Sequence, residues 1–135
     1  MVMDGQGGGI GSAIIKGIRE AVNDELEILA LGTNSIATSR MMKAGANRGA
    51  TGENAIVRTC GKADIIIGPL AILMSNSMMG EVTPSMSNAV CSSEARKILI
   101  PLTQERVEIV GISSEPLPHL VNRAVAIIKE RIRDV

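Results

Sequence analysis

The chain begins with Met1-Val2-Met3-Asp4-Gly5-Gln6-Gly7-Gly8-Gly9-Ile10-Gly11, the stretch that decides its fold. Three apolar residues end at an aspartate, and five glycines follow within seven positions. Residues 9–22 then place apolar side chains at helical spacing. A strand, a glycine loop and a helix in this order predict the first unit of a parallel α/β sheet.

The glycine loop predicts a binding site for a phosphate group. Glycine lets a ligand approach bare backbone, and the start of the next helix presents free N–H groups and the positive end of its dipole. Gly5, Gly9 and Gly11 have the spacing Gly-x-x-x-Gly-x-Gly, which resembles the cofactor loop of short-chain dehydrogenases. The alternative is a glycine-rich turn without a ligand. We expect a ligand, because the loop lies between strand and helix signals as the mechanism requires.

Length and composition narrow the class of protein. The length of 135 residues predicts one Rossmann-like domain, 1–135. The formal charge is zero and no basic run occurs, which argues against a nucleic-acid partner. Neither a membrane span nor a signal peptide is recognisable, so we expect a cytoplasmic protein without a membrane partner. The chain has no aromatic residue and eight Met, which predicts an aliphatic and methionine-rich core.

Strand and helix signals alternate along the chain and predict a three-layer sheet of Rossmann-like or flavodoxin-like type. Strands are expected at 1–4, 26–31, 64–68, 97–102 and 107–111, and helices at 9–22, 36–44, 53–60, from 84 and at 118–133. Residues 45–52 are expected to form a loop, and 69–80 a buried helix or two turns. The expected strand order is 2-1-3-4-5, with 3-2-1-4-5 as the alternative. Only four residues separate 97–102 from 107–111, too few for a parallel crossover, so an antiparallel edge strand is expected.

Loops that follow parallel strands meet at the carboxyl edge of the sheet, and they supply the candidate ligand-binding residues. The first loop and helix start contribute Gly5, Gln6, Gly7, Gly8, Gly9, Ile10, Gly11 and Ser12, and later loops contribute Thr33, Asn34, Asn47, Arg48, Thr51, Asn76, Thr103 and Gln104. Arg48 is the best anion partner by charge and planar shape, with a solvated surface arginine as the alternative. Thr51 is expected to cap the helix that begins near Glu53.

The sequence pattern does not identify the cofactor. An NAD site would have an acidic residue for the ribose where Gly32, Thr33 and Asn34 stand, which leaves room for NADP or another phosphorylated nucleotide held by Arg40 or Arg48. The chain lacks the tyrosine that short-chain dehydrogenases need, and it lacks a P-loop, so both of these reactions are excluded. Asp4 is expected to tether loop N–H groups, with Mg²⁺ binding as the alternative. No metal site is predicted.

Four runs of sequence resemble one family of small bacterial proteins. They are Asp4 to Gly11, Ala30 to Asn34, Ala44 to Ile56 and Glu115 to Leu120. The family is uncharacterised and known only as a domain of unknown function. The resemblance covers nearly the whole chain, and it implies a Rossmann-like cytoplasmic protein without implying a reaction.

We therefore expect a module that binds a nucleotide or another small phosphorylated ligand. One alternative is a small NADP-dependent or phosphate-handling enzyme, with acid–base roles on Asp4, Glu53 or Glu81. Another is a structural or regulatory homo-oligomer whose glycine loop serves close packing. The mean hydropathy of +0.24 also predicts a homodimer or higher homo-oligomer. Its expected contact is the apolar stretch 70–79, for which burial in the core is the competing interpretation.

Overall fold

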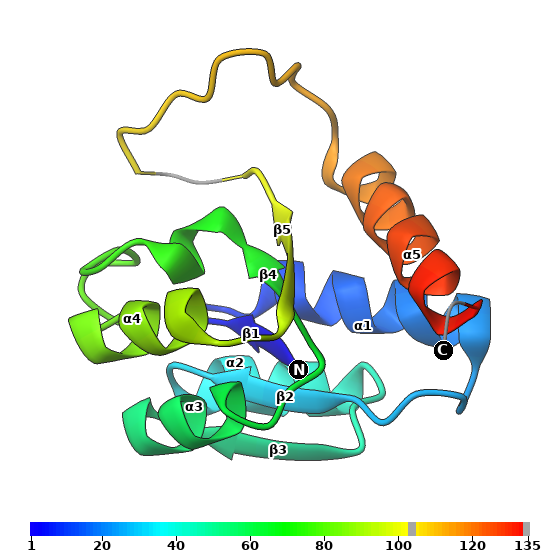
Figure 1. The fold of residues 1–135 in the computed structure, drawn as a ribbon, viewed down its shortest axis with the longest axis horizontal. Coiled ribbons are helices and arrows are strands. Elements are labelled where there is room, and N and C mark those ends of the chain that lie inside the picture. Colours follow the sequence, from blue (N-terminus) through cyan, green and yellow to red (C-terminus); the bar gives the residue numbers. More distant parts are fainter. Residues whose placement is uncertain (103–104, 134–135) are drawn as a thin grey trace.

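A five-stranded sheet with helices on both faces forms the framework of the protein (Figure 1). The computed structural model describes residues 1–102 and 105–133. The strands are β1 (Val2–Asp4), β2 (Leu29–Gly32), β3 (Arg48–Thr51), β4 (Ile65–Pro69) and β5 (Arg96–Ile100). The helices are α1 (Gly9–Val22), α2 (Ser35–Lys43), α3 (Glu53–Cys60), α4 (Pro84–Ser92) and α5 (Leu117–Arg133), with a short 3₁₀ helix, η1 (Leu70–Leu73).

The strand order is β3-β2-β1-β4-β5, and every pairing between described strands is parallel. The strands expected at 26–31, 1–4, 64–68 and 97–102 lie beside one another in the order expected first, 2-1-3-4, but no fifth strand pairs with the last of them among the described residues. Numbered along the observed strands, the sheet has the order 3-2-1-4-5. Its third strand is Arg48–Thr51, which the sequence pattern assigned to a loop. All four residues of β3 are exposed, so no apolar pattern reveals it. The strand forms because it pairs with the whole open edge of β2, from Leu29 to Gly32.

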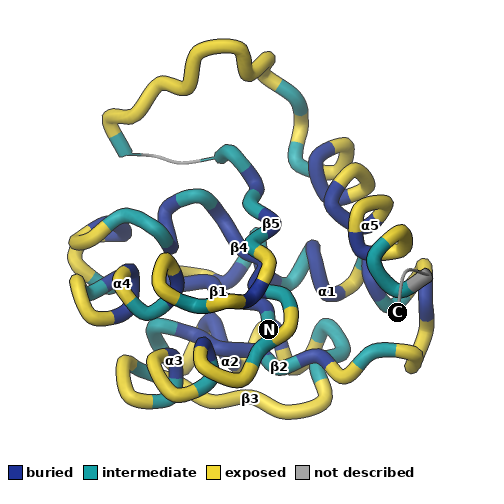
Figure 2. Tube along the Cα trace, in the orientation of Figure 1, coloured by how far each residue is buried: buried dark blue, intermediate teal, exposed yellow. Residues whose placement is uncertain are grey.

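The antiparallel edge strand expected at 107–111 is not present. These residues belong to a segment without regular secondary structure that arches between β5 and α5, and most of it is exposed (Figures 1 and 2). The turn expected before it includes Thr103 and Gln104, which lie outside the described residues. A connection this short excludes a parallel pairing with the preceding strand, but it does not require an antiparallel one.

Apolar side chains form one core on each face of the sheet. Helices α1, α2 and α5 cover the first face, where Val2 of β1 is buried, and α3, α4 and η1 cover the second, where Met3 is buried. Neighbouring residues of a strand point to opposite faces, and this alternation sends adjacent apolar residues into different cores. A central strand that is covered on both faces, such as β4, is therefore apolar at nearly every position.

The stretch 70–79, expected to be a subunit contact, lies mainly in the second core. Ile72 is fully buried, and Ala71 and Met78 are nearly so. Among the apolar residues of the stretch only Met79 projects into solvent, with 96% of its surface exposed. Burial in the core, the competing interpretation, therefore accounts for most of this stretch.

Candidate ligand-binding site

A cavity lies where the loops after β1, β4 and β5 come together. The chain runs from β1 outward through β2 to β3, and then returns to β4 on the other side of β1, so the direction of winding reverses between β1 and β4. In parallel α/β sheets ligands bind in the crevice at this reversal. The cavity has a volume of about 630 Å³, and its lining residues are Asp4, Gln6, Ile10, Pro69, Ala71, Asn76, Met78, Met79, Leu102 and Glu105.

Asp4 binds the start of α1, the position that the sequence pattern offers to a phosphate. Its carboxylate accepts hydrogen bonds from the N–H groups of Gly5 at 2.8 Å and Gly11 at 2.7 Å. Burial raises the pKa of this carboxyl, although the hydrogen bonds from Gly11, Gly5 and Ile10 oppose the shift. The expectation that Asp4 tethers loop N–H groups is confirmed. The carboxylate thereby uses donors that would otherwise face a ligand.

The glycines of the loop have two different roles. Gly8 has a φ of +73°, and a Cβ there would lie 2.9 Å from the Cα of Ala37. A Cβ on Gly11 would lie 2.5 Å from the sulfur of Met41, so this glycine lets α1 pack closely against α2. By contrast, a Cβ on Gly7 or Gly9 would meet only the guanidinium of Arg40, at 3.9 and 3.5 Å. Gly7 and Gly9 are therefore the positions at which the loop is open to a ligand.

Arg40 is the arginine that lies beside this open part of the loop. It comes from the last turn of α2, and its Nη1 donates to the carbonyl of Gly7 at 3.3 Å. The N–H groups of Gly7 and Gly9 donate to no acceptor within residues 1–102 and 105–133, and in the same ranges no carboxylate pairs with Arg40. Two amide donors without an acceptor, and a cation without a carboxylate partner among the described residues, thus lie together at the start of a helix of 14 residues.

Gln6, Thr33 and Asn34 converge on Glu81, which comes from the loop before α4. The Oε1 atom of Glu81 accepts from the Gln6 N–H at 2.8 Å, the Thr33 hydroxyl at 2.7 Å and the Asn34 side-chain amide at 2.8 Å. Partial burial raises the pKa of Glu81, but these hydrogen bonds outweigh burial and leave the pKa below its ordinary value. Three of the expected ligand-binding residues therefore already bind a carboxylate of the chain itself.

Asn34 also fixes the position of this cluster. Its side-chain oxygen accepts from the Ala37 N–H at 2.9 Å and caps α2, while its amide group donates to the carbonyl of Gln6 at 2.9 Å. The cap and the loop are thus joined through one side chain. A polar residue before a helix signals a cap in the sequence, but nothing near Asn34 in the chain indicates its contact with Glu81.

Asn47 and Arg48 do not lie at the cavity. The first pair in the β2–β3 ladder is Leu29 with Arg48, so both residues are at the amino end of the sheet, away from the glycine loop. Asn47 accepts from the Ile28 N–H at 2.6 Å, and Arg48 forms an exposed ion pair with Glu27. The structure separates these two expected site residues from the others because 48–51 forms a strand instead of a loop.

The remaining expected site residues have local contacts or line the cavity. Ser12 donates its hydroxyl to the carbonyl of Gly9 at 3.1 Å, and Ile10 and Asn76 line the cavity. Thr51 shares a hydrogen bond of 2.7 Å with the hydroxyl of Thr38. The expectation that Thr51 caps the next helix is wrong, since the residue before α3 is Gly52 and it has no side-chain cap.

The loop that closes the cavity beside β4 has a strained backbone. Asn76, Met78 and Met79 have φ values of 68°, 55° and 56°, in the left-handed region that residues other than glycine seldom adopt. The N–H of Met78 donates to the carboxylate of Glu105 at 2.7 Å, and the N–H of Asn76 donates to the carbonyl of Val82 at 2.7 Å. Such a conformation persists only where its surroundings hold it, and here the cavity wall depends on it.

The described residues contain no group of three or more His, Cys, Asp or Glu side chains that could hold a metal ion. Nor does this part of the chain include a helix with the length and apolar character needed to cross a membrane.

The chain belongs to the family of the domain of unknown function DUF3842, whose model matches residues 1–133. The resemblance seen in the four sequence runs is thereby confirmed. Neither the curated proteins nor the solved structures contain a match to this chain.

Proposed function

We propose that this DUF3842 protein binds a nucleotide or a similar small phosphorylated ligand at the carboxyl end of its sheet. The observation that carries the proposal is the cavity of about 630 Å³ at the point where the strand order reverses, beside the glycine loop. Its volume falls within the range of ligand pockets, about 300–1,000 Å³. Gln6 and Ile10 line the cavity and flank the open part of the loop, so one ligand can contact both.

The phosphate is assigned to the backbone of Gly7 and Gly9, beside Arg40. Free N–H groups at a helix start attract an anion, and the helix dipole adds to the attraction. Asp4 offsets part of this field, because its carboxylate already occupies the N–H groups of Gly5 and Gly11. Arg40 supplies a positive charge and a planar set of donors that suit a phosphate. We therefore expect most of the phosphate affinity to depend on Arg40.

The organic part of the ligand is assigned to the cavity. Ile10, Met78 and Leu102 provide apolar surface for a ring, and the amides of Gln6 and Asn76 can form hydrogen bonds with its polar edge. The carboxylates of Asp4 and Glu105 also line the cavity, whereas no Lys or Arg does so among the described lining residues. Carboxylates accept hydrogen bonds from hydroxyl groups and repel further phosphates. These features favour a sugar ring over a second phosphate inside the cavity.

The positions of the three carboxylates considered for acid–base chemistry favour binding over catalysis. Glu81 accepts three hydrogen bonds, and Glu53 accepts one from the Thr83 hydroxyl at 2.6 Å. Asp4 lines the cavity, but both of its oxygens are engaged by the loop. A proposal of catalysis would need a carboxylate that faces the ligand without such partners.

Calorimetric titration with matched ligand pairs tests the proposal. The panel pairs AMP with adenosine and ribose 5-phosphate with ribose, and the proteins are wild type, Arg40→Gln and the control Arg48→Gln. A hydrogen bond to a charged group contributes about 1.5–3 kcal/mol, so Arg40→Gln should weaken a phosphorylated ligand about 10- to 150-fold. It should leave the dephosphorylated partner unchanged, and Arg48→Gln should change neither. Absence of binding by every ligand at millimolar concentration, or equal weakening of both members of a pair, would contradict the proposal.

A further inference from the structure

The arch between β5 and α5 carries an exposed apolar segment, Val107-Glu108-Ile109-Val110-Gly111-Ile112. Four of the nine large apolar residues that are exposed in the described chain lie within these six positions, and Val110 is 99% exposed. The backbone of the segment forms hydrogen bonds only within residues 105–112, among the residues that the structure describes. Figure 2 shows the exposure along nearly the whole arch.

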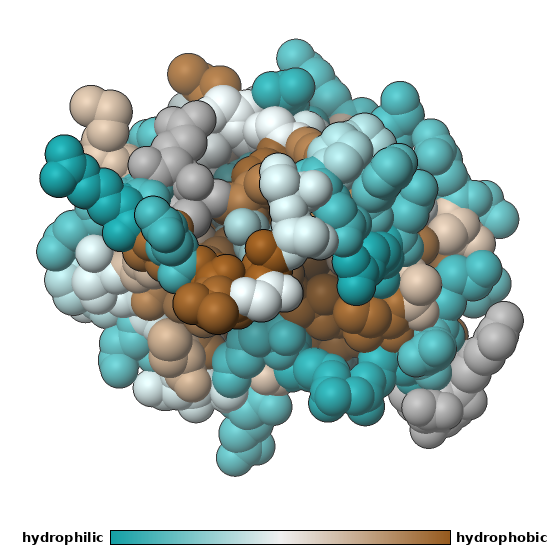
Figure 3. All heavy atoms as spheres, turned by 90° about the horizontal axis from the view of Figure 1, so that it is seen from above, coloured by the Kyte–Doolittle hydropathy of each residue, from teal (hydrophilic) through white to brown (hydrophobic). Residues whose placement is uncertain are grey.

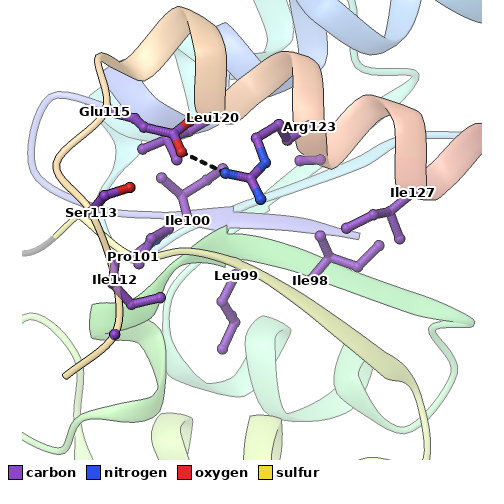
Figure 4. A pocket seen from close by; sticks show the side chains of 12 residues that line it. Ile98, Leu99, Ile100, Pro101, Ile112, Ser113, Glu115, Leu120, Arg123 and Ile127 are labelled. Atoms are coloured by element: carbon purple, nitrogen blue, oxygen red, sulfur yellow. Dashed lines mark hydrogen bonds and ion pairs between the residues drawn. The ribbon is translucent and has the colours of Figure 1, made fainter. Parts of the chain in front are cut away.

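The strand next to this arch has an open edge. β5 pairs with β4, and its other side forms no backbone hydrogen bond with any described residue. Beside it lies a groove of about 320 Å³. It is lined by Ile98 and Ile100 of β5, by Leu120, Ala124 and Ile127 of α5, and by Gly111 and Ile112 of the arch. In Figure 4 the side chains of Ile98, Ile100, Leu120 and Ile127 point into the space between strand and helix, and Glu115 and Arg123 form an ion pair beside it. Figure 3 shows apolar atoms gathered in a hollow on the side of the molecule where the arch stands.

The residue pattern of the segment suits a strand beside β5. Both faces of β5 are covered, because Ile98 and Ile100 pack in the first core and Leu99 packs against the second. A strand added to this edge would lie between the same two layers and would need apolar side chains on both faces. In an extended chain Val107 and Ile109 point to one face, and Val110 and Ile112 to the other. A strand at a solvated sheet face would instead alternate apolar and polar residues.

We propose that two copies of this chain form a two-fold dimer, in which residues 107–112 of each copy pair with the β5 edge of the other. The chain contains both halves of this contact, an open strand edge and an apolar segment that pairs with no strand of the described chain. Gly111 and Ile112 line the groove beside their own β5, but the backbone of the segment forms no hydrogen bond with that strand, and the arch carries residues 107–110 away from it (Figure 1). A contact between two such halves is self-complementary, which a two-fold axis requires. Six extended residues span about 20 Å. The two-fold axis repeats this strand pairing, so each partner buries surface at two places, which brings the buried area towards the ~800 Å² per partner of a stable interface. The inference is independent of the proposed ligand.

Light scattering during gel filtration tests the dimer. Wild type at about 100 µM should have twice the chain mass of 14.2 kDa. The double variant Val110→Glu, Ile112→Glu should raise the dissociation constant at least 100-fold and elute as a monomer with unchanged circular dichroism. Met79→Glu is the matched control, because Met79 is also apolar and exposed but lies outside the arch. A monomeric wild type, or a double variant that dimerises as well as wild type, would overturn the proposal.

Hydrogen exchange of the wild type provides a second measurement that requires no variant to fold. The amides of 97–100 that point to the open side of β5, and the amides of 107–112 that point to the partner, should become protected together, at least tenfold, as the protein concentration rises through the dissociation constant. Protection that is already complete in the dilute monomer would mean that the segment pairs within its own chain, and it would refute the intermolecular contact.

Discussion

Replacing Glu81 by alanine is expected to weaken the contact that joins three loops at the carboxyl end of the sheet. One carboxylate oxygen accepts hydrogen bonds of 2.7 to 2.8 Å from Gln6, Thr33 and Asn34. Hydrogen bonds to charged groups contribute about 1.5–3 kcal/mol each. At this partly exposed position water replaces much of what is lost, so we expect a total loss of about 1–2 kcal/mol. For a chain of this length, the loss lowers the Tm by about 3–8 °C.

The pH dependence separates the charge of Glu81 from its shape. Because hydrogen bonds outweigh partial burial, the pKa of Glu81 is lower in the folded chain than in the unfolded chain. A carboxyl of this kind stabilises the fold above its unfolded pKa, about 4.3, and the contribution disappears as the pH falls through the folded value. Glu81→Gln keeps an acceptor but cannot titrate. The difference in stability between wild type and Glu81→Gln should therefore be largest near neutral pH and should shrink below about pH 4.

Urea denaturation followed by circular dichroism measures both effects. Glu53→Ala is the control, because Glu53 is an exposed carboxylate with one hydrogen bond, from Thr83, and its loss should cost less than about 0.5 kcal/mol. If Glu81→Ala lowers the free energy of unfolding no more than this control, the three hydrogen bonds do not hold the loops together. A difference between wild type and Glu81→Gln that is constant from about pH 7 to pH 3 would show that the charge has no part in the contact.

Other substitutions test the loop and its neighbours by the same denaturation assay. Gly11→Ala should lower the free energy of unfolding by about 1–3 kcal/mol, because the added Cβ would press on Met41. Gly9→Ala should lower it by less than about 1 kcal/mol, and equal losses for the two variants would contradict the close packing at Gly11. Burial raises the pKa of Asp4, so the Asp4 contribution to stability falls as the pH rises from the unfolded value, about 3.9, through the folded value. Asp4→Asn should remove the Asp4 contribution to the pH dependence of the free energy of unfolding. If that pH dependence is unchanged in the variant, other groups are responsible for it. Thr83→Ala should cost about 1 kcal/mol, since the hydroxyl caps α4, and a neutral effect would show that the cap is dispensable.

Contacts between segments far apart in the chain explain why the residues of the site could be predicted only in part from the sequence. The hydrogen bond between Gln6 and Glu81 joins residues 75 positions apart, and Arg40 reaches Gly7 across 33 positions. The sequence pattern favoured Arg48 as the anion partner and offered Arg40 only as a second possible contact for a phosphorylated ribose, because both are cations near a loop signal. Pairing of β3 with β2 sends Arg48 to the amino end of the sheet, while the packing of α2 places Arg40 beside the glycines.

Two strand assignments illustrate the same limit. Residues 107–111 have the composition of a strand, but a strand needs a partner, and within the described chain they have none. Arg48–Thr51 has no apolar pattern, yet it is a strand because β2 presents an open edge at the right place. Strand formation depends on pairing with another segment, so composition alone is a weak guide to it.

The sequence by itself determined the features that depend on neighbouring residues. The first strand, its glycine loop and the helix that follows were read from apolar spacing and glycine positions, and α1 has the expected bounds, Gly9–Val22. Helical spacing is a local property, since side chains three and four positions apart share one face. The tertiary structure alone decided which strand lies at each edge, which arginine lies beside the glycines, and that Asp4 and Glu81 occupy donors of the loop. These features depend on contacts between residues far apart in the chain, and the spacing of residues along the sequence carries no information about such contacts.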